Sequence, residues 1–171
     1  LLERIEEDPT ERLDAREFLL ARLFDIVVGD TDRAEDQWRA VRYDAAGGRR
    51  VFRPLPRDRD WAFVNGEGVL LIAGRRLYPK IIAWGPDLPD VRAATIQAWA
   101  LDRPLLAELE WSDWEAAVSE LQASLTDDVI ADAVQQLPPE WAALSGATIT
   151  EGIRGRRDGL RSFAREYYLL L

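Results

Sequence analysis

The sequence predicts an α+β fold, in which a mostly helical body contains one embedded β-hairpin. Apolar residues recur at helical spacing after residue 13 and again after residue 101, and capping residues bound these stretches. Between them, the turn sequence "DAAGGR" joins two short runs with strand character. The 171 residues, 47% of them apolar, suffice for one core, so we expect a single domain over residues 1–171.

The first expected helix starts after Asp14, whose side chain we expect to cap it, with Glu17 completing a capping box. A broad apolar face then extends to about Val28, and Gly29 supplies the left-handed residue that commonly ends a helix. The chain opens with "LLERIEED", as if already inside a helix, and closes with "EYYLLL", so we expect a fragment of a longer protein.

The hairpin is expected from Trp38–Tyr43 and Arg50–Leu55, because both runs favour strands and glycines lie between them. Pro54 and Pro56 end the second strand or place it at a sheet edge. We divide the domain into residues 12–63, which contain this hairpin, and residues 64–171, which are mainly helical.

Residues 64–95 are harder to interpret. Glu67–Ala73 has the character of a short helix, and the prolines of the segment interrupt the rest. From Leu101 onward the chain reads as helical.

Four helix starts are expected in the C-terminal region. Ser112–Glu115 resembles a capping box, Thr126 caps the next helix, Pro138-Pro139 opens a short one, and Thr148 or Thr150 opens the last. Each glycine in the last helix costs about 1 kcal/mol relative to alanine, so neighbouring segments must stabilise it. These glycines are Gly152, Gly155 and Gly159.

The composition excludes several kinds of chemistry. The absence of cysteine and histidine removes disulfides, thiolate or imidazole metal sites, and catalysis that depends on Ser-His or Cys-His pairs. Any metal must be bound by oxygen atoms, which favours Mg²⁺, Mn²⁺ or Ca²⁺. A net charge of -9 argues against a nucleic-acid partner, and no stretch is long enough for membrane insertion.

Two acidic clusters, "GDTDRAEDQ" (residues 29–37) and "PRDRDWAF" (residues 56–63), flank the hairpin. Such clusters are commonly no more than solvated turns. The alternative is that the hairpin brings them together as one site. Asp32 and Gln37 have the D-x-x-x-x-N spacing of a phosphoryl-transfer loop with Gln in place of Asn, and a hairpin then returns Asp58 and Asp60.

These segments resemble known families. "GDTDRAEDQ" is similar to the catalytic segment of atypical kinase-like folds. "PLPRDRDWAF" resembles the metal-binding segment of spore-coat CotH kinases, and secretory-pathway casein kinases have a similar pair. This kinase resemblance covers residues 24–63 and implies a protein-kinase-like C-lobe.

A second resemblance covers nearly the whole chain. It is to a bacterial domain found beside calcineurin-like metallophosphoesterase and outer-membrane barrel domains. Besides the two acidic segments it includes "LTDDVI" (125–130), "LPPE" (137–140), "RRDGL" (156–160) and Tyr167-Tyr168. It implies a bacterial source, an extracytoplasmic or outer-membrane-associated location, and the remainder of a longer chain as partner.

The kinase resemblance also assigns roles to individual residues. Asp32 takes the catalytic position that orients a hydroxyl group, Gln37 and Asp58 take metal positions, and Asp60 is a further candidate carboxylate. Three residues take supporting positions, namely Asp30, Arg33 and Arg57. The implied cofactors are Mg²⁺ or Mn²⁺ with ATP.

Two departures weaken the analogy. Ala34 stands where the related kinases have histidine, and Lys80, the only lysine, follows the metal segment although a phosphate-binding lysine would precede it. Three functions remain open: a kinase-like phosphotransferase fragment, a non-catalytic module beside a metallophosphoesterase or barrel domain, and a metallophosphoesterase. The last fits poorly, because such sites depend heavily on histidine.

Two further expectations concern aromatic and basic residues. We expect the seven tryptophans to be core or groove-lining residues. We expect Arg156 and Arg157 to be exposed on the last helix, with phosphate contact as the alternative.

Overall fold

Helix α2 (Ala15–Val28) begins and ends where the sequence predicts, in a computed structural model that describes residues 8, 10–65, 74 and 82–171. The Asp14 side chain accepts a hydrogen bond from the Glu17 backbone N–H at 3.0 Å, and Gly29 ends the helix with a φ of 76°. The capping box is only half formed, because the Asp14 N–H donates to the Phe52 carbonyl instead. The helix start is thereby attached to the sheet.

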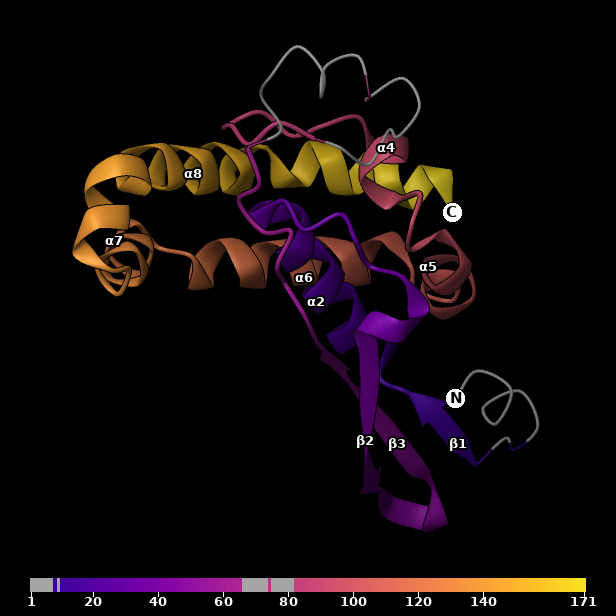
Figure 1. The fold of residues 1–171 in the computed structure, drawn as a ribbon. Coiled ribbons are helices and arrows are strands. Elements are labelled where there is room, and N and C mark those ends of the chain that lie inside the picture. Colours follow the sequence, from indigo (N-terminus) through magenta and orange to yellow (C-terminus); the bar gives the residue numbers. More distant parts are fainter. Residues whose placement is uncertain (1–7, 9, 66–73, 75–81) are drawn as a thin grey trace.

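The predicted hairpin is present as β2 (Trp38–Asp44) and β3 (Arg50–Pro56), which pair antiparallel from Trp38–Pro56 to Asp44–Arg50. A 3₁₀ turn, η2 (Ala46–Gly48), connects them, and both of its glycines have positive φ. The sequence did not predict a third strand, β1 (Glu11–Leu13), which pairs parallel with β3. The resulting sheet has the order β1-β3-β2 and projects from the helical body in Figure 1.

The helices after the second acidic segment begin earlier than the sequence predicts. Two of them precede or span Leu101: α4 (Val91–Thr95) and α5 (Trp99–Leu106). The expected helix at Glu67–Ala73 lies outside the described residues. Asp90 caps α4 by accepting from the Ala93 N–H at 3.1 Å, a signal that the proline-rich surroundings obscured.

The next two helices are close to expectation. Helix α6 (Trp111–Ser124) begins one residue before the expected capping box, because Glu110 and Asp113 form the box instead. Helix α7 (Asp127–Gln135) is capped by Thr126, as predicted.

The prediction of two separate helices after residue 138 is wrong, because α8 (Pro139–Leu170) is continuous over 32 residues. Gly152 and Gly155 face a crossing segment instead of ending the helix. A β-carbon at Gly155 would lie 2.5 Å from Pro86 Cβ, and one at Gly152 would lie 2.7 Å from Trp84 Nε1. Glycine therefore lets residues 84–86 lie directly on the helix.

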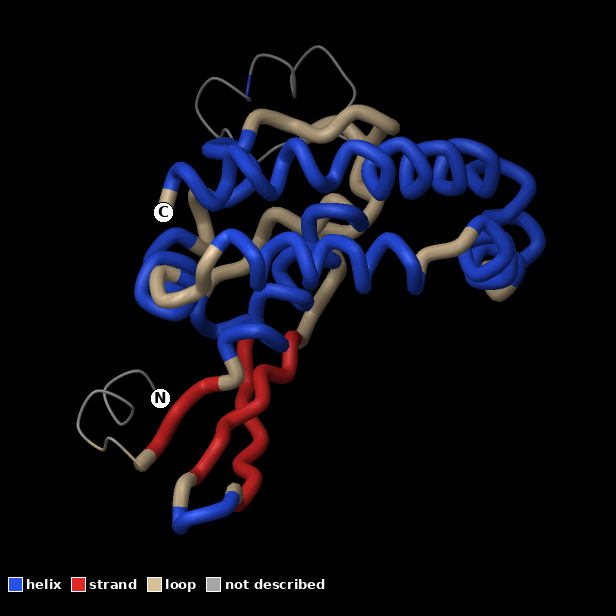
Figure 2. The backbone as a smooth tube through the Cα atoms, turned by 180° about the vertical axis from the view of Figure 1, so that it is seen from behind, coloured by secondary structure: helices blue, strands red, loops and turns tan. Residues whose placement is uncertain are grey.

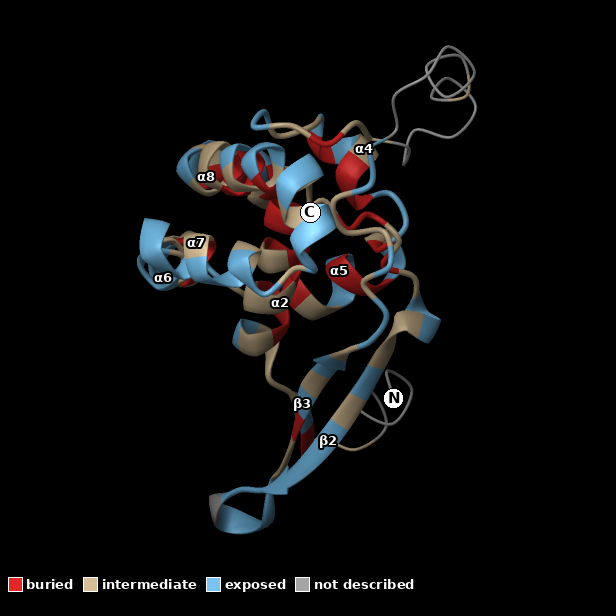
Figure 3. Cartoon of the chain, turned by 60° about the vertical axis from the view of Figure 1, so that its left-hand side comes forward, coloured by how far each residue is buried: buried red, intermediate tan, exposed pale blue. Residues whose placement is uncertain are grey.

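The core lies where α2, α5, α6 and α8 face one another. Figures 1 and 2 show α6 and α8 as long, roughly parallel rods, and α2 packs against both of them. Buried residues gather at these faces in Figure 3, whereas the far end of the hairpin is exposed. Trp114, Leu160 and Tyr167 are fully buried there. No helix in the described ranges combines the length and apolar character needed to cross a membrane.

Candidate functional site

The two acidic segments lie against each other at the base of the hairpin. The Arg57 N–H donates to the Gln37 carbonyl at 2.8 Å, which extends the β2–β3 pairing into both loops. The Phe63 N–H donates to the Val28 carbonyl at 2.9 Å and thereby anchors the second loop to the end of α2. The hairpin thus brings residues 30–37 and 57–63 together.

Arg33 joins the two loops through its buried side chain. Its guanidinium pairs with Asp25, at 3.1 Å from Nε to Oδ2, and with Asp30, and it donates to the Arg57 carbonyl. The Arg33 guanidinium carbon also lies 5.8 Å from the centroid of the Trp38 ring. Since Asp32 precedes Arg33 and Asp58 follows Arg57, both aspartates are next to residues that hold the loops together.

Asp25, on the last turn of α2, is a buried carboxylate shared by three arginines. Arg59 Nε lies 3.0 Å from Oδ1, and Arg22 Nη1 lies 3.3 Å from Oδ2, beside the Arg33 contact. Burial raises the pKa of Asp25, and Arg22, Arg33 and Arg59 oppose that shift. The carboxylate therefore connects α2 to both loops.

A second buried pair continues the network into the helical body. Arg22 Nε and Nη2 donate to the two Asp102 oxygens at 2.8 and 3.1 Å, and the Tyr167 hydroxyl also donates to Asp102. Burial disfavours the charge on Arg22, but Asp102 and the neighbouring groups outweigh it and raise the Arg22 pKa. Burial raises the pKa of Tyr167. The loops, α2, α5 and α8 are thereby connected by charged contacts.

Asp30, in the first acidic loop, is the last residue of this network. It accepts from the Asp32 N–H at 3.2 Å, pairs with Arg33, and is buried. Burial raises the pKa of Asp30 to about 6, and the Arg33 charge opposes this shift. A carboxyl group with this pKa changes its charge just below neutral pH.

The candidate ligand residues differ in exposure. Asp58 and Asp60 are exposed, whereas Asp32 and Gln37 are partly buried. Asp58 has a φ of 51°, a left-handed conformation that aspartate tolerates better than most residues, and it turns the chain between Arg57 and Arg59. Within the described ranges, no three Asp or Glu side chains are grouped so that they could hold a metal ion. Asp32, Asp58 and Asp60 do not form a metal-holding trio by themselves.

Arg156 is buried, so the expectation that it is exposed is wrong. It donates to the carbonyls of Ile26, at 3.2 Å, and Gly85, at 2.8 Å, and lies 4.4 Å above the Trp84 ring. Burial lowers its pKa to about 10. Its contact with the C-terminal end of α2 also explains the close packing around Gly29. Arg157 instead bridges Asp127 and Asp158 near the surface.

Five residues of this network are not among the predicted site residues: Arg22, Asp25, Arg59, Asp102 and Tyr167. A signal was present for two of them, because Arg22 and Asp25 interrupt the apolar run of α2 three residues apart. Opposite charges at that spacing within an otherwise apolar helix indicate a buried ion pair. Nothing local marked Asp102 or Tyr167, whose roles depend on distant partners.

The tryptophans mostly line the core and its edge, with one clear exception. Trp114 and Trp84 are buried, and Trp38 packs on Phe18 with ring centroids 4.7 Å apart. Trp141 is 65% exposed on α8.

Comparison with known proteins found no matching family model, no matching curated protein and no matching solved structure.

Proposed function

We propose that this chain is the C-lobe part of a kinase-like phosphotransferase, with its divalent-cation site at the two joined loops. One observation supports this most directly: Arg33 and Gln37 of the first loop both contact Arg57 of the second. These contacts keep the segment of Asp32 beside the segment of Asp58. That juxtaposition is what phosphoryl transfer needs from a hydroxyl-orienting aspartate and a metal-binding one.

In this proposal the cation completes its coordination with phosphate oxygens. Mg²⁺ in phosphoryl-transfer sites is commonly bound by one or two carboxylates together with substrate phosphates. Asp58 and Gln37 supply the protein ligands, with Asp60 as a further carboxylate. A cation site of this kind does not require three clustered carboxylates, so Asp58, Gln37 and Asp60 can supply its protein ligands.

Asp32 would orient an acceptor hydroxyl and accept its proton. Its loop is fixed on one side by Asp30 and on the other by Arg33, both of them buried. Such fixation matters because phosphoryl transfer depends mainly on positioning and electrostatics. Asp30, Arg33 and Arg57 are then positioning residues.

A non-catalytic module beside a metallophosphoesterase or barrel domain is the second candidate. Ala34 favours it, since its methyl group lines an apolar cavity where the related kinases have an imidazole. The sequence also contains no glycine-rich phosphate cradle, and Lys80 is out of order. For both reasons we expect this chain alone to bind Mn²⁺ with ATP weakly and not to turn it over.

The test is a titration of Mn²⁺ in the presence and absence of a non-hydrolysable ATP analogue, followed by the electron paramagnetic resonance signal of free Mn²⁺. The analogue should increase Mn²⁺ binding by the wild type. Asp58→Asn should reduce that binding about tenfold or more, because it removes a charged ligand. Asp87→Asn, an exposed aspartate in another loop, is the matched control and should bind as the wild type does.

ATP turnover separates the two candidates. Turnover by the full-length parent that disappears in Asp32→Asn would support the phosphotransferase. Metal binding without turnover in the parent would favour the module. Equal Mn²⁺ binding by Asp58→Asn and Asp87→Asn would contradict the cation site itself.

A further inference from the structure

A cavity of about 820 Å³ lies between the base of the sheet and helices α2 and α5. Its walls come from distant parts of the chain: Leu13 and Phe52 from two strands, Phe18 from α2, Trp38 and Ala40 from β2, and Leu105 from α5. This volume is within the range of pockets that enclose drug-sized ligands. The walls are largely apolar, so the cavity suits a ring-sized apolar body.

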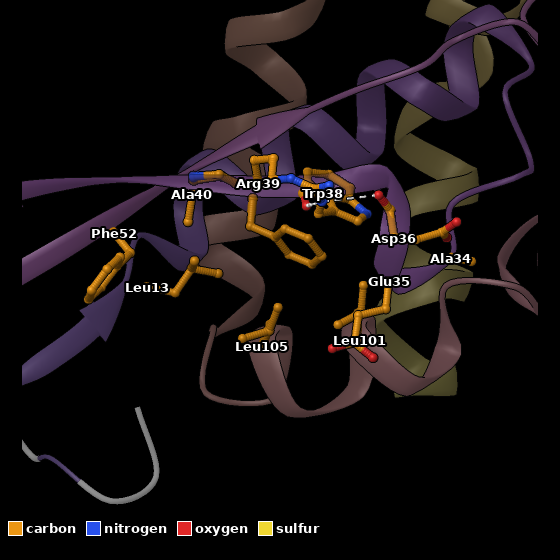
Figure 4. A pocket seen from close by; sticks show the side chains of 12 residues that line it. Leu13, Ala34, Glu35, Asp36, Trp38, Arg39, Ala40, Phe52, Leu101 and Leu105 are labelled. Atoms are coloured by element: carbon orange, nitrogen blue, oxygen red, sulfur yellow. Dashed lines mark hydrogen bonds between the residues drawn. The ribbon is translucent and has the colours of Figure 1, made fainter. Parts of the chain in front are cut away.

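The two ends of the cavity differ in chemistry. Figure 4 shows Leu13 and Phe52 at one end, and Glu35 reaching alongside Leu101 at the other, close to Asp36. Glu35 and Asp36 are exposed and belong to η1 (Glu35–Gln37), the turn that leads into β2. The apolar walls thus end at two adjacent carboxylates.

Arg39 is the basic group at this rim. Its guanidinium donates to two backbone carbonyls, those of Trp38 at 2.7 Å and Asp36 at 3.3 Å. Within the described residues, neither Glu35 nor Asp36 forms an ion pair. Two carboxylates against one guanidinium leave the rim with a formal charge of -1, which favours a cation over an anion at this end.

We propose that this cavity binds a small amphiphilic amine, with its apolar body between Phe18, Phe52 and Leu105 and its ammonium group beside Glu35 and Asp36. The proposal does not depend on the cation site, because none of the residues that it uses was assigned there. Apolar burial supplies most of the affinity, and the carboxylates set the orientation and the charge preference.

The test uses three fluorescent probes with one apolar body: anthracenylmethylamine, anthracenylmethanol and anthracene carboxylate. Fluorescence anisotropy of each is followed as the protein is titrated. The amine should bind about three- to tenfold more tightly than the alcohol, as expected for a partly exposed ion pair, and the carboxylate should bind most weakly. High salt should reduce the amine's advantage.

Variants locate the binding. The double change Glu35→Gln with Asp36→Asn should make the amine and the alcohol bind equally. Glu108→Gln with Glu140→Gln, which removes two exposed acids elsewhere, should preserve the wild-type preference.

Ala40→Trp and Leu105→Trp fill the cavity from two different elements, and each should weaken all three probes about tenfold or more. Ala116→Trp, on the exposed face of α6, is their control. Circular dichroism and thermal melts identify the cavity variants that fold. Because the two variants lie on different elements, the test still works if one of them does not fold. Equal wild-type affinity for the amine and the carboxylate, or binding unaffected by a folded cavity variant, would overturn the proposal.

Discussion

Arg33 contacts both acidic loops through one buried guanidinium. Its partners are two buried carboxylates and a backbone carbonyl, so its loss would leave Asp25 and Asp30 with less compensation in a low-dielectric environment. The sequence places Arg33 next to Asp32, the predicted catalytic residue, but nothing in it indicates that the Arg33 side chain is buried. That information depends on α2 and on the second loop.

We expect Arg33→Met to reduce the free energy of unfolding by about 3–5 kcal/mol, since breaking a buried ion pair leaves an uncompensated charge. Urea denaturation followed by circular dichroism measures this loss. Arg39→Met changes an exposed arginine six residues away and should cost less than about 1 kcal/mol. Equal losses in the two variants would show that the Arg33 contacts contribute little to stability.

The raised pKa of Asp30 predicts that the stability of the folded state depends on pH, and it sets the sign of that dependence. The folded state holds a proton on Asp30 up to about pH 6, whereas the unfolded carboxyl releases it near 3.8. The folded state therefore binds more protons between these values, and this group's contribution to stability falls as the pH rises through that window. We expect wild type to lose about 1 kcal/mol relative to Asp30→Asn between pH 5 and pH 7. Denaturation curves of both proteins at the two pH values provide the check, and a difference that does not change with pH would contradict it.

Among the elements, α8 shows most clearly which features can be predicted from residues close in the sequence and which cannot. The glycines of α8 predict that neighbouring segments must support the helix, and Trp84 and Pro86 do pack on it. The sequence nevertheless predicts two helices, because nothing in it shows that residues 84–86 lie against these glycines. By contrast, α2, the hairpin and the Thr126 cap were predictable, since their signals lie within a few residues of each other.

Substitutions in α8 should separate helix propensity from packing. Gly155→Ala gains helix propensity, but its methyl group would meet Pro86, so we expect a net loss of about 1–3 kcal/mol. Gly159→Ala is the control, because the nearest atom is the end of the Leu88 side chain at 3.2 Å, and its effect should stay within about 1 kcal/mol. Thermal unfolding of both variants measures the difference. Stabilisation by Gly155→Ala would mean that residues 84–86 do not lie on the helix as described.

At the scale of the whole molecule, the sequence predicted the α+β class and the order of helix, acidic loop, hairpin and acidic loop. It did not predict β1, whose three residues are too few to show a period, or the charged network from Asp30 to Tyr167. That network joins residues more than a hundred positions apart, and spacing along the chain cannot reveal it. The apolar cavity was missed for the same reason, because its walls come from five separate elements.

Thermal unfolding with Mn²⁺, in the presence of the non-hydrolysable ATP analogue, tests most directly whether the joined loops form one divalent-cation site. An ion that binds only the folded state stabilises it, so tenfold excess over the dissociation constant should raise the melting temperature by about 3–6 °C. Relative to the analogue without Mn²⁺, we expect this rise for wild type and Asp87→Asn but not for Asp58→Ala. No rise in wild type, or an equal rise in Asp58→Ala, would contradict the site and leave the acidic segments as solvated loops.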